Sequence, residues 1–236
     1  MGSFAARDSR FIYTDETGDQ VLVDYNDFYR NKSRIPFHSI TGDRTVPDLI
    51  MQLMDACEGL SVGSPEEGLL LEYTLFDILF STFIAGSREP ARVVEIGCQN
   101  GLLSYHLGTI LGAFNNSSVL YCMNNTIGGG SEDLWTDLVG QIKEEDLPDI
   151  RFAACDYEQT FFQEETFDAV VIGAYQSLEN PEKVLPEMKR IVKPGGVVFC
   201  FLDPSDWLLY DMFYWTFPES IDYSVGRRRI LLSRKI

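Results

Sequence analysis

The stretch that decides the fold is ARVVEIGCQNGLLSYHLG, residues 91–108. A short apolar run, RVVEI, contains an acidic residue near its end, and the glycine-containing turn GCQNG follows it. From Leu102 the apolar residues recur with helical spacing, so the stretch is typical of a strand, a tight turn and a helix. Such a unit is either a pocket for a nucleotide-like cofactor or only a close strand-to-helix corner.

The same alternation continues to the end of the chain. Strands are predicted in SSVLYCMN, DIRFAACD, FDAVVIGAY and VVFCFL, and the segments between them have helical patterns at 102–113, 132–145 and about 182–192. DWLLYDMFYWTF also looks helical, and IDYSVG and RRRILLSRK are expected to form an antiparallel pair. Alternating strands and helices predict a Rossmann-like, doubly wound, mainly parallel sheet of seven strands with an antiparallel C-terminal strand.

The first 87 residues have a different character and are expected to form an α+β extension or cap, with residues 88–236 as the sheet domain. RFIYTDETGDQVLVDY alternates around a turn and predicts a β-hairpin. A helical pattern begins at Val46. Ser64, Pro65 and Glu67 then provide the cap signals for a second helix, which runs to about Ala85. That helix is apolar on most sides, so we expect it to be buried or to form a dimer surface.

The amino-acid composition indicates which classes of binding partner and which cellular compartment to expect. Hydrophobic residues are 45% of the chain, and the net charge of −17 argues against nucleic acid and anionic membrane surfaces as partners. No membrane span or secretory signal is apparent. The one strongly basic stretch, GRRRILLSRK, is interpreted as the solvated face of an edge strand. The five cysteines show no C-x-x-C pairing, which favours a reduced, cytoplasmic protein.

The candidate site lies where the first parallel strand ends. In open parallel sheets, ligands bind beyond the carboxyl ends of the strands, where the strand order reverses. Gly97 and Gly101 let the main chain pass close to a ligand, and the helix that follows offers unpaired N–H groups to an anion. Glu95 is a carboxylate in an apolar strand, and burying it requires a hydrogen-bond partner.

VVEIGCQNG, RFAACD, FDAVVIGA and LPEMKRIVKPGGVVFCFL, in this order, resemble the class I S-adenosylmethionine-dependent methyltransferases. The resemblance covers residues 88–236, and LENPEKVLPEMKRIVKPGG is particularly similar to the small-molecule branch of the family. It implies S-adenosylmethionine as cofactor and a small-molecule methyl acceptor as substrate.

The resemblance also implies roles for individual residues. The motif-I loop around the methionine part of the cofactor corresponds to Glu95, Gly97, Cys98, Gln99 and Gly101. Asp156 matches the acidic residue that binds the adenine amino group, and Tyr157 beside it is expected to pack on the adenine. Ala174, Tyr175 and Gln176 follow the fourth strand, where the family lines the methyl-transfer site.

The chain departs from the family pattern in two places. Gln99 replaces the middle glycine of motif I, as in E-x-G-x-x-x-G forms. The second strand ends in Met123, Asn124 and Asn125 instead of the acid that takes the ribose hydroxyls, and an uncharged amide is expected to hold the ribose less firmly. Glu132 and Asp133 could replace that acid, but their position favours the first turn of a helix.

Candidates for proton transfer are few. Tyr175 is the best placed by position, and His38 lies in an N-terminal loop that could fold over the site. His106 is expected to point away from the pocket. A catechol-type metal site is rejected because Pro204 follows Asp203 where a second ligand is needed. Asp203 and Asp206 can also simply cap the next helix.

Three functions remain open. The first is metal-independent methyl transfer to a small molecule. The second is a non-catalytic binding or scaffold protein with weakened or lost cofactor binding, motivated by the missing ribose acid. The third is an enzyme of the same fold that performs other chemistry, since fold does not fix function.

Overall fold

The structure is a computed structural model that describes residues 10–14, 20–24, 65–85, 89–98, 101–115, 117–125, 149–174, 178–203, 205–225 and 228–236. The helical patterns predicted at 46–57 and 132–145, the turn of the N-terminal hairpin and Ser64 lie outside the described residues. The hairpin strands are described: β1 (Arg10–Thr14) pairs antiparallel with β2 (Gln20–Asp24).

Within the described residues, seven strands form one sheet in the order β5-β4-β3-β6-β7-β9-β8. Their bounds are β3 (Arg92–Ile96), β4 (Val119–Asn124), β5 (Asp149–Ala154), β6 (Phe167–Ala174), β7 (Val192–Leu202), β8 (Ile221–Val225) and β9 (Arg228–Arg234). The pairs from β5 to β7 are parallel, and β9 is antiparallel to both β7 and β8. The predicted fold class is confirmed.

The interpretation of the basic stretch as an edge strand is wrong. β9 lies between β7 and β8, and its Ile230 and Leu231 are buried. The Arg229 guanidinium lies 5.4 Å and 5.1 Å from the ring centres of Trp207 and Tyr210. The run of basic residues suggested an edge strand. An inner strand can also carry cations, because they can stack on neighbouring aromatic rings.

β7 begins earlier than predicted and includes the KPGG segment. Gly195 takes a left-handed conformation, with φ of +77°, and its amide donates to the Lys235 carbonyl over 2.6 Å. Lys235 in turn donates its amide to Gly196 over 2.9 Å. This pairing with the C-terminal residues lets the strand start before the apolar run that marks it in the sequence.

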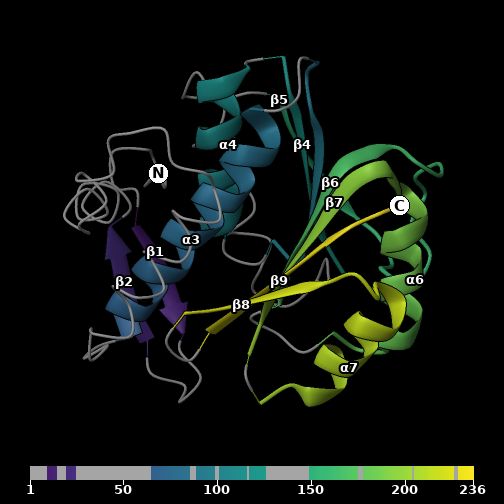
Figure 1. Ribbon diagram of the computed structural model, residues 1–236. Coiled ribbons are helices and arrows are strands. Elements are labelled where there is room, and N and C mark those ends of the chain that lie inside the picture. Colours follow the sequence, from purple (N-terminus) through teal and green to yellow (C-terminus); the bar gives the residue numbers. More distant parts are fainter. Residues whose placement is uncertain are drawn as a thin grey trace, which may run out of the picture.

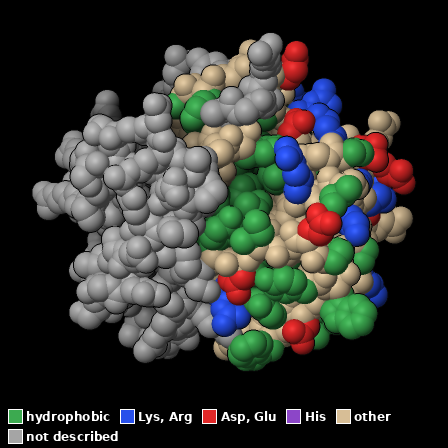
Figure 2. Space-filling view, viewed as in Figure 1, with side chains coloured by type: hydrophobic (Ala, Val, Ile, Leu, Met, Phe, Trp, Pro, Cys, Tyr) green, Lys and Arg blue, Asp and Glu red, His purple; other side chains and the backbone are tan. Residues whose placement is uncertain are grey.

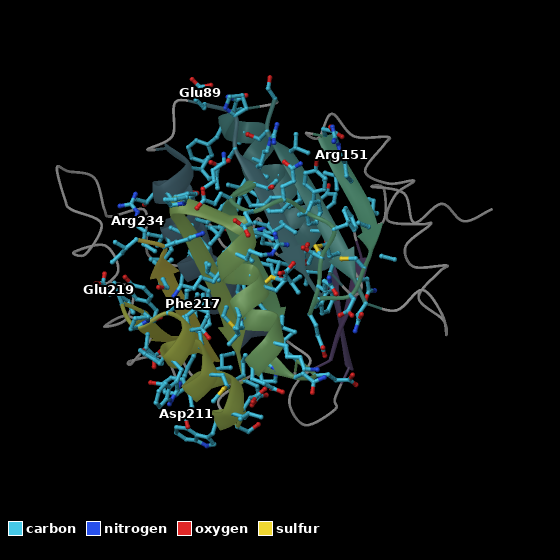
Figure 3. The ribbon with its side chains drawn as sticks, turned by 90° about the vertical axis from the view of Figure 1, so that its right-hand side faces the viewer. Glu89, Arg151, Asp211, Phe217, Glu219 and Arg234 are labelled. Carbon is cyan, nitrogen blue, oxygen red and sulfur yellow. The ribbon has the colours of Figure 1, made fainter. Side chains whose placement is uncertain are left out.

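Helices cover both faces of the sheet (Figure 1). One face carries α3 (Pro65–Ala85) and α4 (Leu102–Phe114), and the other carries α6 (Pro181–Ile191) and α7 (Trp207–Thr216). Two hydrophobic clusters result, one on each side of the strands. Figure 3 looks onto the α6 and α7 layer, with Phe217 at the end of α7 and Arg151 at the outer edge of the sheet on β5.

The α3 helix belongs to the core beneath the sheet. Phe76 and Phe80 are fully buried, and the Phe76 ring meets Phe199 of β7 edge-on at 5.3 Å between ring centres. Between α3 and α4, the ring of His106 contacts the Asp77 carboxylate, and both residues are buried. The N-terminal segment therefore supplies part of the layer that covers the sheet.

The helices α6 and α7 differ in how the sequence marks them. Pro186 lies inside α6, which runs without a break from Pro181 to Ile191, and the proline side chain is exposed. Asp206 caps α7, its side chain accepting from the Leu209 amide at 3.0 Å. α7 leaves Trp207 and Trp215 exposed, and hydrophobic side chains show on the lower part of this face (Figure 2).

No helix among the described residues combines the length and apolar character that crossing a bilayer requires.

Replacing Phe76 with alanine should lower the free energy of unfolding by about 3–5 kcal/mol, because it leaves a cavity between α3 and β7. Phe114, at the end of α4, is 48% exposed, so Phe114→Ala should change that free energy by less than about 0.5 kcal/mol. Chemical denaturation measures both. If Phe76→Ala lowered the free energy of unfolding as little as Phe114→Ala, α3 would not be part of the core.

Candidate functional site

The strand order reverses between β3 and β6. From β3 the chain moves outward to β4 and β5, and then crosses back to β6 and β7 on the other side. In sheets of this kind the reversal opens a crevice at the carboxyl ends of the strands. Gly97 follows the last residue of β3, and Gly173 is the next-to-last residue of β6, so the two glycines lie next to each other at this point of the sheet.

Gly97 and Gly173 are glycines for two different reasons. Gly97 has φ of +79°, and a Cβ there would meet only the Gly173 carbonyl oxygen, at 3.5 Å. A Cβ on Gly173 would lie 3.3 Å from the Leu103 side chain and 3.5 Å from the Gly97 carbonyl oxygen. Gly97 is therefore a conformational requirement, whereas Gly173 makes room for the turn to approach.

The turn after β3 leads directly into α4. Gly101 is the N-cap of the helix in a left-handed conformation, with φ of +82°, and its amide donates to the Cys98 carbonyl at 2.7 Å. The first turn of α4 contains no acidic residue. The N-terminus of α4, which is the positive end of the helix dipole, lies just beyond the carboxyl end of β3. A helix N-terminus in this place suits a carboxylate. Gln99 lies outside the described residues.

Glu95 lies beneath the turn. Its carboxylate is buried and accepts a hydrogen bond from the Ser104 hydroxyl of α4 at 2.5 Å. Burial raises the pKa of Glu95 to about 7, although hydrogen bonds from Ser104 and the Cys122 thiol work in the opposite direction. Burial also raises the pKa of the Cys98 and Cys122 thiols, so both stay protonated.

Asn124 ends β4 beside the turn. Alternation along the strand places it on the same face as Cys122, the face that α4 covers. Its carbonyl accepts from the Cys155 amide at 3.3 Å, which ties β4 to the loop after β5. Asn124 therefore ends its strand next to the glycine turn, and its contact with a ribose stays a prediction.

Asp156 and Tyr157 follow β5. Asp156 is exposed, and its Oδ1 accepts from the Glu158 amide at 2.8 Å. The Tyr157 hydroxyl donates to the Met123 carbonyl at 3.3 Å and accepts from the Asn125 amide at 2.9 Å. Burial raises the pKa of Tyr157 well above its ordinary value, so the hydroxyl remains a donor.

The loop that carries these two residues is fixed to α6 by a buried carboxylate. Glu187 accepts from the Thr160 amide at 2.8 Å and from its hydroxyl at 2.7 Å, and it pairs with Arg190 at 2.6 Å. Arg190 also donates to the Phe162 carbonyl at 2.8 Å. Burial by itself would raise the pKa of Glu187, but the hydrogen bonds from Arg190 and Thr160 outweigh it and lower the pKa.

Sequence reasoning missed this support. Glu187 and Thr160 are 27 positions apart, and the spacing of Glu187 and Arg190 on a helix suggests only a local ion pair. Ser104, the partner of Glu95, was also missed. A serine on the apolar side of a helix, nine residues after a buried acid, is the signal that could have found it.

The remaining candidates divide into those the structure places and those it does not. Ala174 ends β6 opposite Leu202 of β7. Tyr175, Gln176 and His38 lie outside the described residues. His106 lies in the α3–α4 interface with Asp77, which agrees with its expected direction away from the pocket. Asp203 accepts from the amide and hydroxyl of Ser205 at 2.7 and 2.6 Å.

Glu95→Gln should flatten the pH dependence of stability. The folded chain holds a proton on Glu95 up to about pH 7, whereas the unfolded chain loses it near 4.5. This contribution is therefore complete below pH 4.5 and declines by about 3 kcal/mol as the pH rises through 7. Glutamine keeps an acceptor for Ser104 and does not ionise.

Denaturation at pH 5 and pH 8 measures the effect. The wild type should lose stability between the two values, and Glu95→Gln should lose less. Ser104→Ala removes a hydrogen bond that lowers the Glu95 pKa, so it should move the decline to higher pH. An identical decline in wild type and Glu95→Gln would contradict the burial of this carboxylate.

Comparison with known proteins agrees with this geometry. A family profile described as a methyltransferase domain matches residues 94–200, from β3 into β7. The demethylmenaquinone methyltransferase of Lysinibacillus sphaericus (strain C3-41) is 38% identical over 63 residues, which are 26% of this chain and 27% of that protein. The chain thus matches only about a quarter of that curated relative.

Solved structures share the fold at low sequence identity. A protein from Methanosarcina mazei titled as a SAM-dependent methyltransferase has a TM-score of 0.50 at 11% identity, with 67% of this chain and 97% of that chain covered. The CMeT domain of the citrinin polyketide synthase has a TM-score of 0.57 at 11% identity, covering 88% of this chain and 65% of that one. The cyclase SpnF has a TM-score of 0.54 at 12% identity, covering 80% and 93%.

The methyltransferase profile covers the same residues as the reversal of strand order and the glycine turn. Residues 94–200 therefore form a methyltransferase domain, and the chain has the fold of the S-adenosylmethionine-dependent methyltransferases.

Proposed function

We propose that the chain binds S-adenosylmethionine at the carboxyl ends of β3 to β6 and catalyses transfer of its methyl group to a small molecule. The observation that carries the proposal is the left-handed Gly97 at the strand reversal. It faces Gly173 and leads into a helix whose first turn contains no acidic residue. A glycine turn that leads directly into the N-terminus of a helix is the arrangement that suits a nucleoside with an amino-acid tail.

The described residues fit such a group. The amides at the start of α4 and the turn through Gly97 and Gly101 would hold the methionine part, and Asn124 would face the ribose. Asp156 would accept from the adenine amino group, since its turn with Glu158 fixes the carboxylate at the end of β5. Tyr157 would lie along the base. Glu95 supports the turn from below by its bond to Ser104.

S-adenosylmethionine, when bound, supplies a methyl group activated by a sulfonium. The chain would then contribute orientation and exclusion of water, and holding two reactants in line can account for much of the rate. Tyr175 follows β6 at the position where an acceptor would lie, and we propose it as the group that takes the acceptor's proton. His38 is the alternative base.

Three observations support a small-molecule acceptor without a metal. The net charge of −17 disfavours nucleic acid as an acceptor, and the matched relative is by name a demethylmenaquinone methyltransferase. At the end of β7 the Asp203 carboxylate is already bonded to Ser205, and Pro204 follows it. We therefore propose that methyl transfer does not depend on a divalent metal.

Dialysis against EDTA should leave turnover unchanged within about twofold if the acceptor is held by protein groups alone. The measurement is the rate of formation of the demethylated cofactor by mass spectrometry, before and after adding Mg²⁺ back. A loss of more than tenfold that Mg²⁺ restores would contradict metal independence.

A binding or scaffold function is the second candidate, and the observation that favours it is Asn124 in place of an acid. It predicts no saturable binding of S-adenosylmethionine or of its demethylated product in calorimetry. A third candidate, other chemistry on the same fold, is favoured by the likeness to the cyclase SpnF. It predicts cofactor binding without formation of the demethylated product.

Gly97→Ala and Gly195→Ala form a matched pair that tests the site. Both residues have left-handed φ values, +79° and +77°, so each alanine should cost about 1–2 kcal/mol of stability. A Cβ on Gly195 meets no atom within 4 Å, and Gly195 lies at the opposite end of the sheet from the crevice. Only Gly97→Ala should weaken cofactor binding, by about tenfold or more.

Calorimetric titration of S-adenosylhomocysteine, with thermal melting for stability, reads out both effects. Equal dissociation constants for the two variants would place the ligand elsewhere.

A further inference from the structure

Tyr157 spans the three segments that meet at the crevice. Its hydroxyl donates to the Met123 carbonyl and accepts from the Asn125 amide, so it bonds to the main chain on both sides of Asn124. The Met123 carbonyl also accepts from the amides of Gly97 and Cys98 at 3.0 and 3.1 Å. One oxygen therefore joins the glycine turn, the end of β4 and the loop after β5.

The direction of these bonds shows which edge of β4 Tyr157 reaches. In a strand, the carbonyl of one residue and the amide two positions later point to the same edge. The Gly97 amide marks that edge as the one facing β3, whereas the Cys155 amide bonds the Asn124 carbonyl on the edge facing β5. The tyrosine starts beyond β5 and reaches across the end of β4, so Asn124 is held from both edges.

The loop that carries Tyr157 is itself held in place. Glu158 pairs with Lys183 at 2.8 Å and accepts from the Asn180 side chain at 2.6 Å, at the start of α6. The bonds of Thr160 to Glu187 add a buried anchor within the same loop. A series of contacts therefore links α6 to the loop after β5, and the Tyr157 hydroxyl links that loop to the end of β4.

We propose that Tyr157 is a positioning residue that fixes Asn124 and the glycine turn relative to each other for binding the ribose of the cofactor. The inference rests on the proposed function. An acid at the end of the second strand can attract ribose hydroxyls through charge, but an amide depends on geometry, because its hydrogen bonds are neutral and weaker. Holding the main chain on both sides of Asn124 supplies that geometry.

The test is a double-mutant cycle of Tyr157→Phe and Asn124→Ala, read by calorimetric titration of S-adenosylhomocysteine. Each single variant should weaken binding by about three- to tenfold, the worth of one or two neutral hydrogen bonds. The double variant should bind about as weakly as the weaker single variant, since both act through one contact. Tyr121→Phe is the matched control on the same strand, because its hydroxyl bonds Arg151 at the outer edge; its affinity should equal that of wild type.

Hydrogen exchange of the Asn125 amide gives a readout that needs no cofactor, and it should be faster in Tyr157→Phe and unchanged in Tyr121→Phe. Additive losses in the cycle, or unchanged exchange at Asn125, would overturn the positioning role while leaving the proposed function intact. Tighter binding by Tyr157→Phe would also overturn it, because the ring would then be competing with the nucleoside. Absence of binding by the wild type would overturn the proposed function and this inference together.

Discussion

The carbonyl oxygen of Met123 is the point on which the crevice depends. It accepts from the two amides that begin the glycine turn and from the hydroxyl of Tyr157. Gly97 can meet it only in a left-handed conformation, and Gly173 lets the turn come close to β6. The shape of the strand ends follows from this geometry: β3 stops at a glycine turn, and α4 starts directly after it with no acidic residue in its first turn.

Buried carboxylates support this arrangement from two sides. Glu95 lies under the turn, where burial raises its pKa and Ser104 donates a hydrogen bond to it, and Glu187 ties the loop after β5 to α6 through Thr160 and Arg190. The two differ in their compensation. Glu187 has a guanidinium partner that keeps it charged, whereas the donors to Glu95 among the described residues are neutral, and two thiols lie nearby. A buried acid with such weak compensation makes the turn sensitive to pH near neutrality.

The described strands and helices of residues 88–236 could be predicted because their apolar patterns are strong and local. The helix from Pro65 was predicted for the same reason, with its proline at the first turn. The edge assignment of the basic stretch failed, since the position of a strand within a sheet is set by pairing and not by its own residues. The early start of β7 was missed because it depends on Gly195 pairing with Lys235, forty residues later.

The candidate site was predictable only in outline. Gly97 and Gly101 were indicated by their position in the turn after the first strand, and Asp156 by the resemblance to the methyltransferases. The contact between Thr160 and Glu187 joins two segments 27 positions apart, so it could not be predicted from spacing. The bridge from Tyr157 to both sides of Asn124 is of the same kind, and it gives the missing ribose acid a structural context that the sequence did not contain.

The most direct measurement is a crystal structure of the chain grown with S-adenosylhomocysteine. The account predicts the nucleoside beyond the ends of β3, β4 and β5, with its amino-acid tail at the first turn of α4 and its adenine beside Asp156. A crevice closed by the protein's own side chains, or a nucleoside bound elsewhere on the chain, would contradict it.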